Sequence, residues 1–130
     1  MVLLQIAEPG AGPEPDMQRK VAVGIDLGTT NSLIAHFDGA SLQVLQDGSG
    51  SPSLPSVVYF GASDVRIGQA AMAQASAEPA NTIASAKRML GRARGEFEDD
   101  PYVTLAPGDT LAFATDAGAK TPVEVSAAIL

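Results

Sequence analysis

The feature that most constrains the fold is an alternating apolar run that ends at a carboxylate and a glycine. From Lys20 to Leu27, apolar residues alternate with small ones, which is the period of a strand with one buried face. Asp26 stands near the end of this strand, where a carboxylate is costly unless it is paired or close to a cation. Gly28 lets the backbone turn sharply and approach a ligand. The sequence therefore predicts a strand that brings an acidic side chain to a tight turn.

The turn after this strand carries the residues of a candidate phosphate site. Gly28, Thr29, Thr30 and Asn31 supply hydroxyls and backbone N–H groups, and successive amides in a turn can form a concave anion site. A carboxylate beside a phosphate fits a hydrated Mg²⁺ that lies between them. The loop lacks the lysine of a P-loop and is not a Gly-x-Gly-x-x-Gly turn. An ordinary hairpin turn is the alternative for these residues.

Turn signals divide the next stretch into short elements. Asp38-Gly39 indicates a hairpin, so the start of the chain is predicted to be a β-meander. An alanine-rich run that stops before a proline predicts a helix. The expected elements are strands at Ser32–Phe37, Leu42–Leu45, Ser56–Phe60 and Val65–Ile67, a loop at 47–55, and a helix at Ala70–Ala77.

A longer helix is predicted at Asn81–Leu90. Asn81 can cap its start and Gly91 can end it. The spacing of Ile83, Ala86 and Leu90 puts these residues on one helical face.

The last part of the chain gives weaker signals. Strands are expected at Tyr102–Leu105, Thr110–Ala114 and Thr121–Val123. Ser126 is expected to cap a helix that begins at Ala127. Because the sequence stops inside the first turn of that helix, and so short a helix is unstable alone, we expect a truncated chain.

Composition excludes several classes of function. The net charge is −7, from 15 acidic and 8 basic residues, which argues against a nucleic-acid partner because phosphate contacts need a Lys/Arg surplus. The chain has no cysteine, so it can form no disulfide and no cysteine-ligated metal site. No apolar run is long enough to span a membrane, and the N-terminus lacks the basic region of a signal peptide. We therefore expect a cytoplasmic protein without a membrane partner.

Several motifs together resemble one family. Gly24–Ser32 is similar to the first phosphate motif of the superfamily of actin, hexokinase and the heat-shock ATPases, in the form used by DnaK-type heat-shock chaperones. Leu54–Val58, Asn81–Arg92 and Val125–Leu130 resemble further stretches of those chaperones. The resemblance runs from Val21 to the end of the chain. Ahead of it, Leu3–Gly10 resembles the leader of the HscA-type subfamily, which serves iron–sulfur cluster assembly.

The resemblance implies a fold and a domain division. The fold would be α/β, a lobe of the actin-like (ribonuclease H-like) ATPase type, and the chain would hold part of the nucleotide-binding domain. Residues 1–18, in which 8–16 contain three prolines and two glycines, would form a flexible leader. Residues 19–130 would form the N-terminal part of the ATPase domain. Within it, 19–45 and 122–130 would belong to the core subdomain and about 46–121 mostly to the outer subdomain.

The resemblance also implies site residues. Gly28, Thr29, Thr30 and Asn31 would bind ATP or ADP. Asp26 would be catalytic and would hold Mg²⁺ through water. Spacing alone favours a lysine at position 87 that covers core atoms with its stem and reaches water with its head. In DnaK-type chaperones the matching lysine reaches the terminal phosphate and the attacking water, so Lys87 is expected to be catalytic.

The implied function is that of an ATP-dependent molecular chaperone, an ATP hydrolase as a complete protein, with this segment alone inactive. Its expected partners are a J-domain co-chaperone of the HscB type and an iron–sulfur scaffold protein of the IscU type. Three alternatives remain: a general DnaK-type folding chaperone, a sugar or glycerol kinase of the same superfamily, and a non-catalytic interaction fragment.

Overall fold

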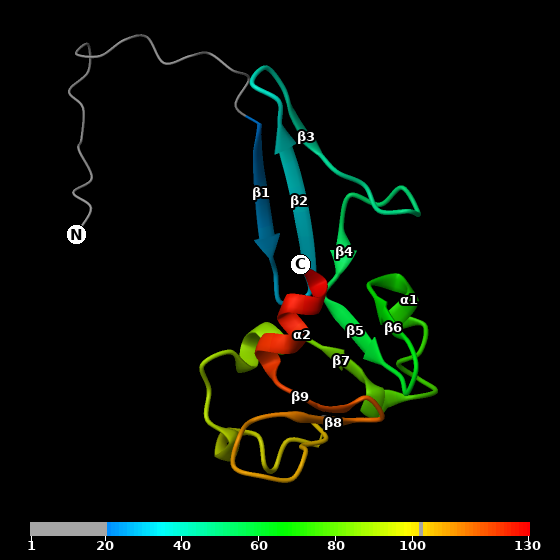
Figure 1. Ribbon diagram of the computed structural model, residues 1–130, viewed down its shortest axis with the longest axis vertical. Coiled ribbons are helices and arrows are strands. Elements are labelled where there is room, and N and C mark those ends of the chain that lie inside the picture. Colours follow the sequence, from blue (N-terminus) through cyan, green and yellow to red (C-terminus); the bar gives the residue numbers. More distant parts are fainter. Residues whose placement is uncertain (1–20, 102) are drawn as a thin grey trace, which may run out of the picture.

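The computed structural model describes residues 21–101 and 103–130, which form a mixed α/β structure with three β-sheets (Figure 1). The leader expected at 1–18 lies outside the described residues. The elements in chain order are β1 (Ala22–Leu27), β2 (Asn31–Phe37), β3 (Leu42–Val44), β4 (Leu54–Pro55), β5 (Val57–Phe60), β6 (Val65–Ile67), α1 (Gln69–Met72), the 3₁₀ turn η1 (Pro79–Asn81), β7 (Thr82–Ala84), the 3₁₀ turns η2 (Ala86–Met89) and η3 (Arg94–Glu96), β8 (Phe113–Thr115), β9 (Gly118–Lys120) and α2 (Pro122–Ile129).

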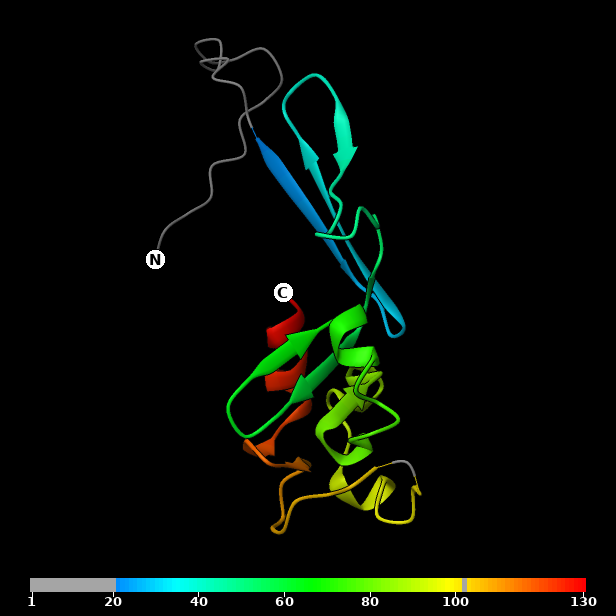
Figure 2. The ribbon, with the colours of Figure 1, turned by 90° about the vertical axis from the view of Figure 1, so that its right-hand side faces the viewer.

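The first sheet is the expected β-meander. β1, β2 and β3 pair antiparallel in that order, and β4 pairs with the start of β2. The Asp38 carboxylate accepts hydrogen bonds from the N–H groups of Ala40 and Ser41 at 2.9 and 2.8 Å. These bonds close the turn between β2 and β3, and they lower the pKa of Asp38. In both views of the ribbon this hairpin extends away from the rest of the molecule (Figures 1 and 2).

The hydrophobic core lies around the second sheet, whose order is β6-β5-β7. All four residues of the central strand β5 are buried. Helix α2 packs against this sheet by inserting Val125, which is fully buried. The core cluster consists of Val58, Phe60, Ile83, Ala86, Met89, Leu111, Phe113 and Val125.

The prediction of a helix at Asn81–Leu90 is wrong. The segment instead forms the end of η1, then β7, then η2. Ser85, between β7 and η2, has a left-handed backbone with φ of 56°, which no α-helix tolerates. The cause is tertiary: β7 supplies β5 with its second hydrogen-bonded neighbour, with Ile83 opposite Val58. Ile83 and Ala86 still face the core, but through a strand and a 3₁₀ turn.

Asn81 is a buried cross-link and not a helix cap. Its side-chain N–H groups donate to Glu78 at 3.0 Å and to Asp116 at 2.8 Å, and its carbonyl oxygen accepts the Asp116 backbone N–H at 2.8 Å. The Tyr59 hydroxyl donates to the same oxygen of Glu78 at 2.9 Å. This network joins η1 to the β8–β9 turn, 35 residues further along the chain.

The C-terminal helix begins earlier than expected. Thr121, in a segment predicted to be a strand, is the N-cap of α2. Its hydroxyl accepts the Glu124 N–H at 3.2 Å, while the Glu124 carboxylate accepts the Thr121 N–H at 2.8 Å. This is a capping box, with Pro122 at the first helical position. Ser126, predicted to be the cap, lies within the helix and donates to the carbonyl of Pro122 at 2.7 Å.

The remaining helices and strands agree in part with those predicted from the sequence. The helix expected at Ala70–Ala77 covers only Gln69–Met72 and continues as turns, because Ala71 is the one buried residue of α1 and packing stabilises it little. The two-residue strand β4 lies in the segment predicted to be a loop. The strand expected at Thr110–Ala114 is shifted to β8, while β9 was not predicted. Of Tyr102–Leu105, Tyr102 lies outside the described residues and Leu105 forms a single bridge with Phe113.

Within the ranges that the structure describes, no helix has the length and apolar character required to cross a bilayer.

Candidate functional site

The turn between β1 and β2 has a conformation that only glycine can adopt at its first position. Leu27 ends β1 and Asn31 begins β2, with Leu27 paired to Ser32. A Cβ atom added to Gly28 would lie 2.0 Å from the backbone oxygen of Asn31. Such a distance is far inside van der Waals contact. Gly28 therefore allows the chain to fold back on itself within three residues.

The tip of this turn presents polar groups that form no hydrogen bond within the described residues. Among the described residues, no group accepts a hydrogen bond from the backbone N–H of Thr29 or of Thr30. The side chains of Asp26, Thr29 and Asn31 likewise form no hydrogen bond or ion pair within the described part of the chain. Adjacent free amides and hydroxyls in a turn suit an anionic ligand.

The structure brings Lys87 to this turn from 60 residues away. The Lys87 ammonium donates a hydrogen bond to the carbonyl oxygen of Leu27 at 2.7 Å. Leu27 lies between Asp26 and Gly28 in the chain. The structure therefore brings the predicted cation close to the backbone that connects the predicted carboxylate to the turn. Lys87 is exposed, and it leaves the backbone from η2 and not from the predicted helix.

Ser56 is a residue of this region that sequence reasoning did not single out. Its hydroxyl donates to the carbonyl oxygen of Gly28 at 2.8 Å, and its backbone N–H donates to that of Thr30 at 2.8 Å. The Ser56 hydroxyl also lies 2.9 Å from that of Ser32. The only sequence signal was the likeness of Leu54–Val58 to a family motif, which gave Ser56 no role.

Direct metal ligation has no support in the described residues, because they contain no cluster of three or more His, Cys, Asp or Glu side chains able to hold a metal ion. The water-mediated role of Asp26 does not require such a cluster. A pocket of about 160 Å³ lies against apolar residues of the first sheet, and a second of about 270 Å³ lies near Leu111. Neither pocket is lined by Asp26, Lys87 or residues 28–31.

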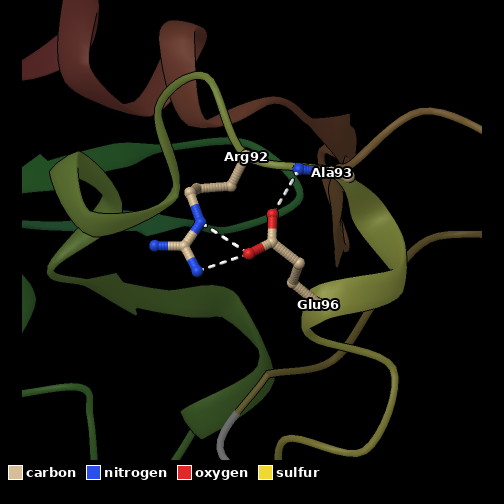
Figure 3. Close-up of polar contacts among 3 residues, drawn as sticks. All are labelled: Arg92, Ala93 and Glu96. Carbon is tan, nitrogen blue, oxygen red and sulfur yellow. Dashed lines mark hydrogen bonds and ion pairs between the residues drawn. The ribbon is translucent and has the colours of Figure 1, made fainter.

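Two of the basic residues that follow Lys87, Arg92 and Arg94, have structural roles. The Arg92 guanidinium forms an ion pair with Glu96, and its Nε lies 2.7 Å from the carboxylate (Figure 3). The other carboxylate oxygen of Glu96 accepts the Ala93 N–H at 2.9 Å. The bond from Arg92, more than that from Ala93, lowers the pKa of Glu96. Arg94 donates to the carbonyl of Ala106 at 2.7 Å. These contacts hold the η3 segment, whereas the Lys87 ammonium contacts the backbone beside the turn.

Comparison with known proteins agrees with these motifs. The family model described as Hsp70 protein matches residues 22–130. The chain is 48% identical to the "Chaperone protein HscA homolog" of Acidovorax ebreus (strain TPSY) and 48% identical to that of Acidithiobacillus ferrooxidans (strain ATCC 53993 / BNL-5-31). It is 49% identical to that of Burkholderia multivorans (strain ATCC 17616 / 249). Each match includes 100% of this chain but only 21–22% of the relative. The chain thus spans about a fifth of the length of these proteins.

Proposed function

Because the chain belongs to the Hsp70 family, we propose that it forms the N-terminal part of the ATPase domain of an ATP-dependent chaperone. The observation that carries this proposal is the hydrogen bond from Lys87 to Leu27, which brings an ammonium beside a glycine turn. Two amides of that turn have no acceptor among the described residues. A cation and oriented N–H groups are the parts that stabilise charge on a transferring phosphoryl group.

We propose an actin-like lobe as the fold, with residues 19–45 and 122–130 in its core subdomain and about 46–121 mostly in the outer one. The pocket on the first sheet supports this division. It is lined by Ile25 and Leu33 from the sheet and by Ile129 and Leu130 from the end of the chain. These two distant parts of the sequence therefore share one apolar surface.

The proposed roles follow from what each residue can donate or accept. Gly28 lets the backbone come close to the phosphates, and Thr29, Thr30 and Asn31 offer N–H and side-chain donors. Lys87 orients the attacking water and offsets developing negative charge. Asp26, whose carboxylate has no partner in the described residues, would hold Mg²⁺ through water, and the metal would supply charge neutralisation at the phosphates.

The relatives' names support a narrower proposal. Because the chain is 48–49% identical to proteins named HscA homologues, we assign the complete protein to iron–sulfur cluster assembly in the cytoplasm. Its partners would be an HscB-like J-domain co-chaperone and an IscU-like scaffold protein. Stimulation of ATP hydrolysis by the scaffold protein, and not by generic unfolded peptides, would distinguish this role from general protein folding. The 130-residue chain alone is not expected to hydrolyse ATP.

The function is tested with Lys87→Ala in the full-length protein. Loss of the ammonium is expected to lower kcat by roughly a hundredfold or more, as for other removed transition-state donors, while the Kd for ATP changes little. Single-turnover hydrolysis and equilibrium ATP binding separate the two effects. Arg88→Ala is the matched control, because it removes the same charge from the adjacent exposed residue of η2. Full turnover in Lys87→Ala would exclude this lysine from the reaction.

A further inference from the structure

We propose that Ser56 is a positioning residue that holds the turn between β1 and β2 in its ligand-ready conformation. This inference rests on the proposed nucleotide site and adds to it a residue that does not touch the ligand. Ser56 lies between β4 and β5, and it is only 3% exposed. Its contacts extend to two of the three residues in the turn, Gly28 and Thr30.

The donors in this network can be assigned from the acceptors present. A carbonyl oxygen can only accept, so the bond between the Ser56 hydroxyl and Gly28 uses the single Ser56 proton. Ser56 must therefore accept in its 2.9 Å contact with Ser32. The result is a directed relay from Ser32 through Ser56 to the Gly28 carbonyl. Ser32 is itself 6% exposed, so water has little access to compete with the relay.

The relay controls where the turn's amides point. A trans peptide unit is planar, and its N–H points away from its C=O. The Gly28 carbonyl and the Thr29 N–H belong to one such unit, and the Thr30 carbonyl and the Asn31 N–H belong to another. When Ser56 draws both carbonyls toward itself, both N–H groups turn to the opposite side. The Thr29 N–H, which has no acceptor among the described residues, is thereby kept free for a ligand.

Loss of the hydroxyl would act selectively on one of these two peptide units. Ser56→Ala removes the donor to Gly28 but retains the backbone bond from residue 56 to Thr30. The Gly28–Thr29 unit would then be free to rotate, and its amide would spend part of its time away from the phosphate. No other described residue donates to the Gly28 carbonyl.

The experiment compares Ser56→Ala, Ser56→Thr and Ser126→Ala in the full-length protein. Ser126 is the matched control: it is 7% exposed and donates one hydrogen bond, at 2.7 Å, to a carbonyl within α2. The measurements are kcat/KM for ATP, the melting temperature, and the NMR order parameter of the Thr29 amide. Both alanine variants should lose melting temperature, because each removes one hydrogen bond from a buried hydroxyl to a carbonyl oxygen.

Only Ser56→Ala should change the site. We expect its kcat/KM for ATP to fall by roughly tenfold, or ~1.4 kcal/mol. The order parameter of the Thr29 amide should fall from about 0.85 toward 0.6. Ser56→Thr keeps the hydroxyl and should restore both values. If Ser56→Ala fails to fold, Ser32→Ala tests the outer bond of the relay, with an expected loss of about threefold.

The outcomes separate this inference from the proposed function. Unchanged kcat/KM and an unchanged Thr29 amide in a folded Ser56→Ala protein would overturn the positioning role while the ATPase proposal stands. Equal losses in Ser56→Ala and Ser126→Ala would also overturn it, since the effect would then be general destabilisation. A wild-type protein that binds no ATP would overturn the proposed function and, with it, any role for Ser56 toward a nucleotide.

Discussion

Two small residues, Gly28 and Ser56, set the path of the turn that joins β1 to β2. Gly28 removes a clash, because any side chain there would meet the Asn31 carbonyl at 2.0 Å. Ser56 adds a bond of 2.8 Å that fixes the peptide unit after Gly28. One residue permits the conformation and the other selects it.

Gly28→Ala is expected to distort the turn in the full-length protein. The added methyl group cannot be accommodated without a backbone shift of the kind that costs about 1–3 kcal/mol, so both thermal stability and affinity for ATP should fall. Calorimetric unfolding and ATP titration measure the two effects. Gly24→Ala is the control, because a Cβ at Gly24, in the preceding strand β1, has no neighbour within 4 Å. Equal behaviour of the two variants would contradict the steric argument.

The residues of the candidate site differ in how far the sequence could reveal them. Asp26 and the Gly28 turn are contiguous, so one local pattern predicted them as a unit. Lys87 and Ser56 reach the turn only through tertiary folding, over 60 and 28 residues. Spacing alone favoured a snorkelling lysine at position 87, and only family resemblance suggested a site role. For Ser56 no local signal exists, because a serine between two strands is ordinary.

At the scale of elements, the β-meander was predictable and the segment after Asn81 was not. Alternation and the Asp38-Gly39 turn specify β1 to β3 from neighbouring residues alone. The residues Ile83 and Ala86 have a spacing that fits a helix, but β5 is fully buried and takes β7 as its second partner. Hydrogen bonding to a buried strand outweighs a weak local helix preference. The adjacent β-branched pair Thr82-Ile83 was the signal that favoured a strand.

The capping box of α2 carries a testable pH dependence. The Thr121 N–H, and after it the Thr121 hydroxyl, lower the pKa of Glu124 from its ordinary value of 4.5. A carboxylate whose pKa is lower in the folded state stabilises the fold above the unfolded pKa, and this stabilisation is lost as pH falls through the folded pKa. Glu124→Gln should therefore flatten the dependence of unfolding free energy on pH below about 4.5.

Urea unfolding at several pH values between about 3 and 6 measures this slope. Thr121→Val offers a graded comparison, since it removes the hydroxyl but keeps the backbone N–H, the larger cause of the shift. Its slope should lie between those of wild type and Glu124→Gln. If all three slopes coincide, the capping box contributes nothing to the acid sensitivity of the fold.

At the scale of the whole molecule, apolar surface is distributed unevenly. The core around β5 is well covered, whereas the first sheet exposes large apolar side chains on both faces. On one face Val23 and Ile25 are 57% and 52% exposed, and on the other Leu42 and Val44 are 70% and 47% exposed. Contiguous apolar patches of this kind mark surfaces that bind other protein.

The 130-residue chain on its own is therefore expected to self-associate. Size-exclusion chromatography with light scattering should show oligomers at about 100 μM, and a dye that reports exposed apolar surface should bind. The double variant Leu42→Thr, Val44→Thr keeps the strand propensity of β3 but removes apolar area, so it should shift the chain toward monomer. A wild-type chain that remains monomeric and binds no dye would show that the exposed faces of the sheet do not mediate self-association.

The open edge of β1 remains uncovered for several seconds while the rest of the chain is synthesised. In the described residues β1 pairs only with β2, and its sequence Ala-Val-Gly-Ile-Asp-Leu contains no proline or lysine to discourage pairing with another chain. Ribosomes add about 5–20 residues per second. The hairpin thus leaves the ribosome several seconds before α2. The end of α2 lines the apolar pocket on this sheet. For that interval, the strand that holds Asp26 is an accessible template for aggregation.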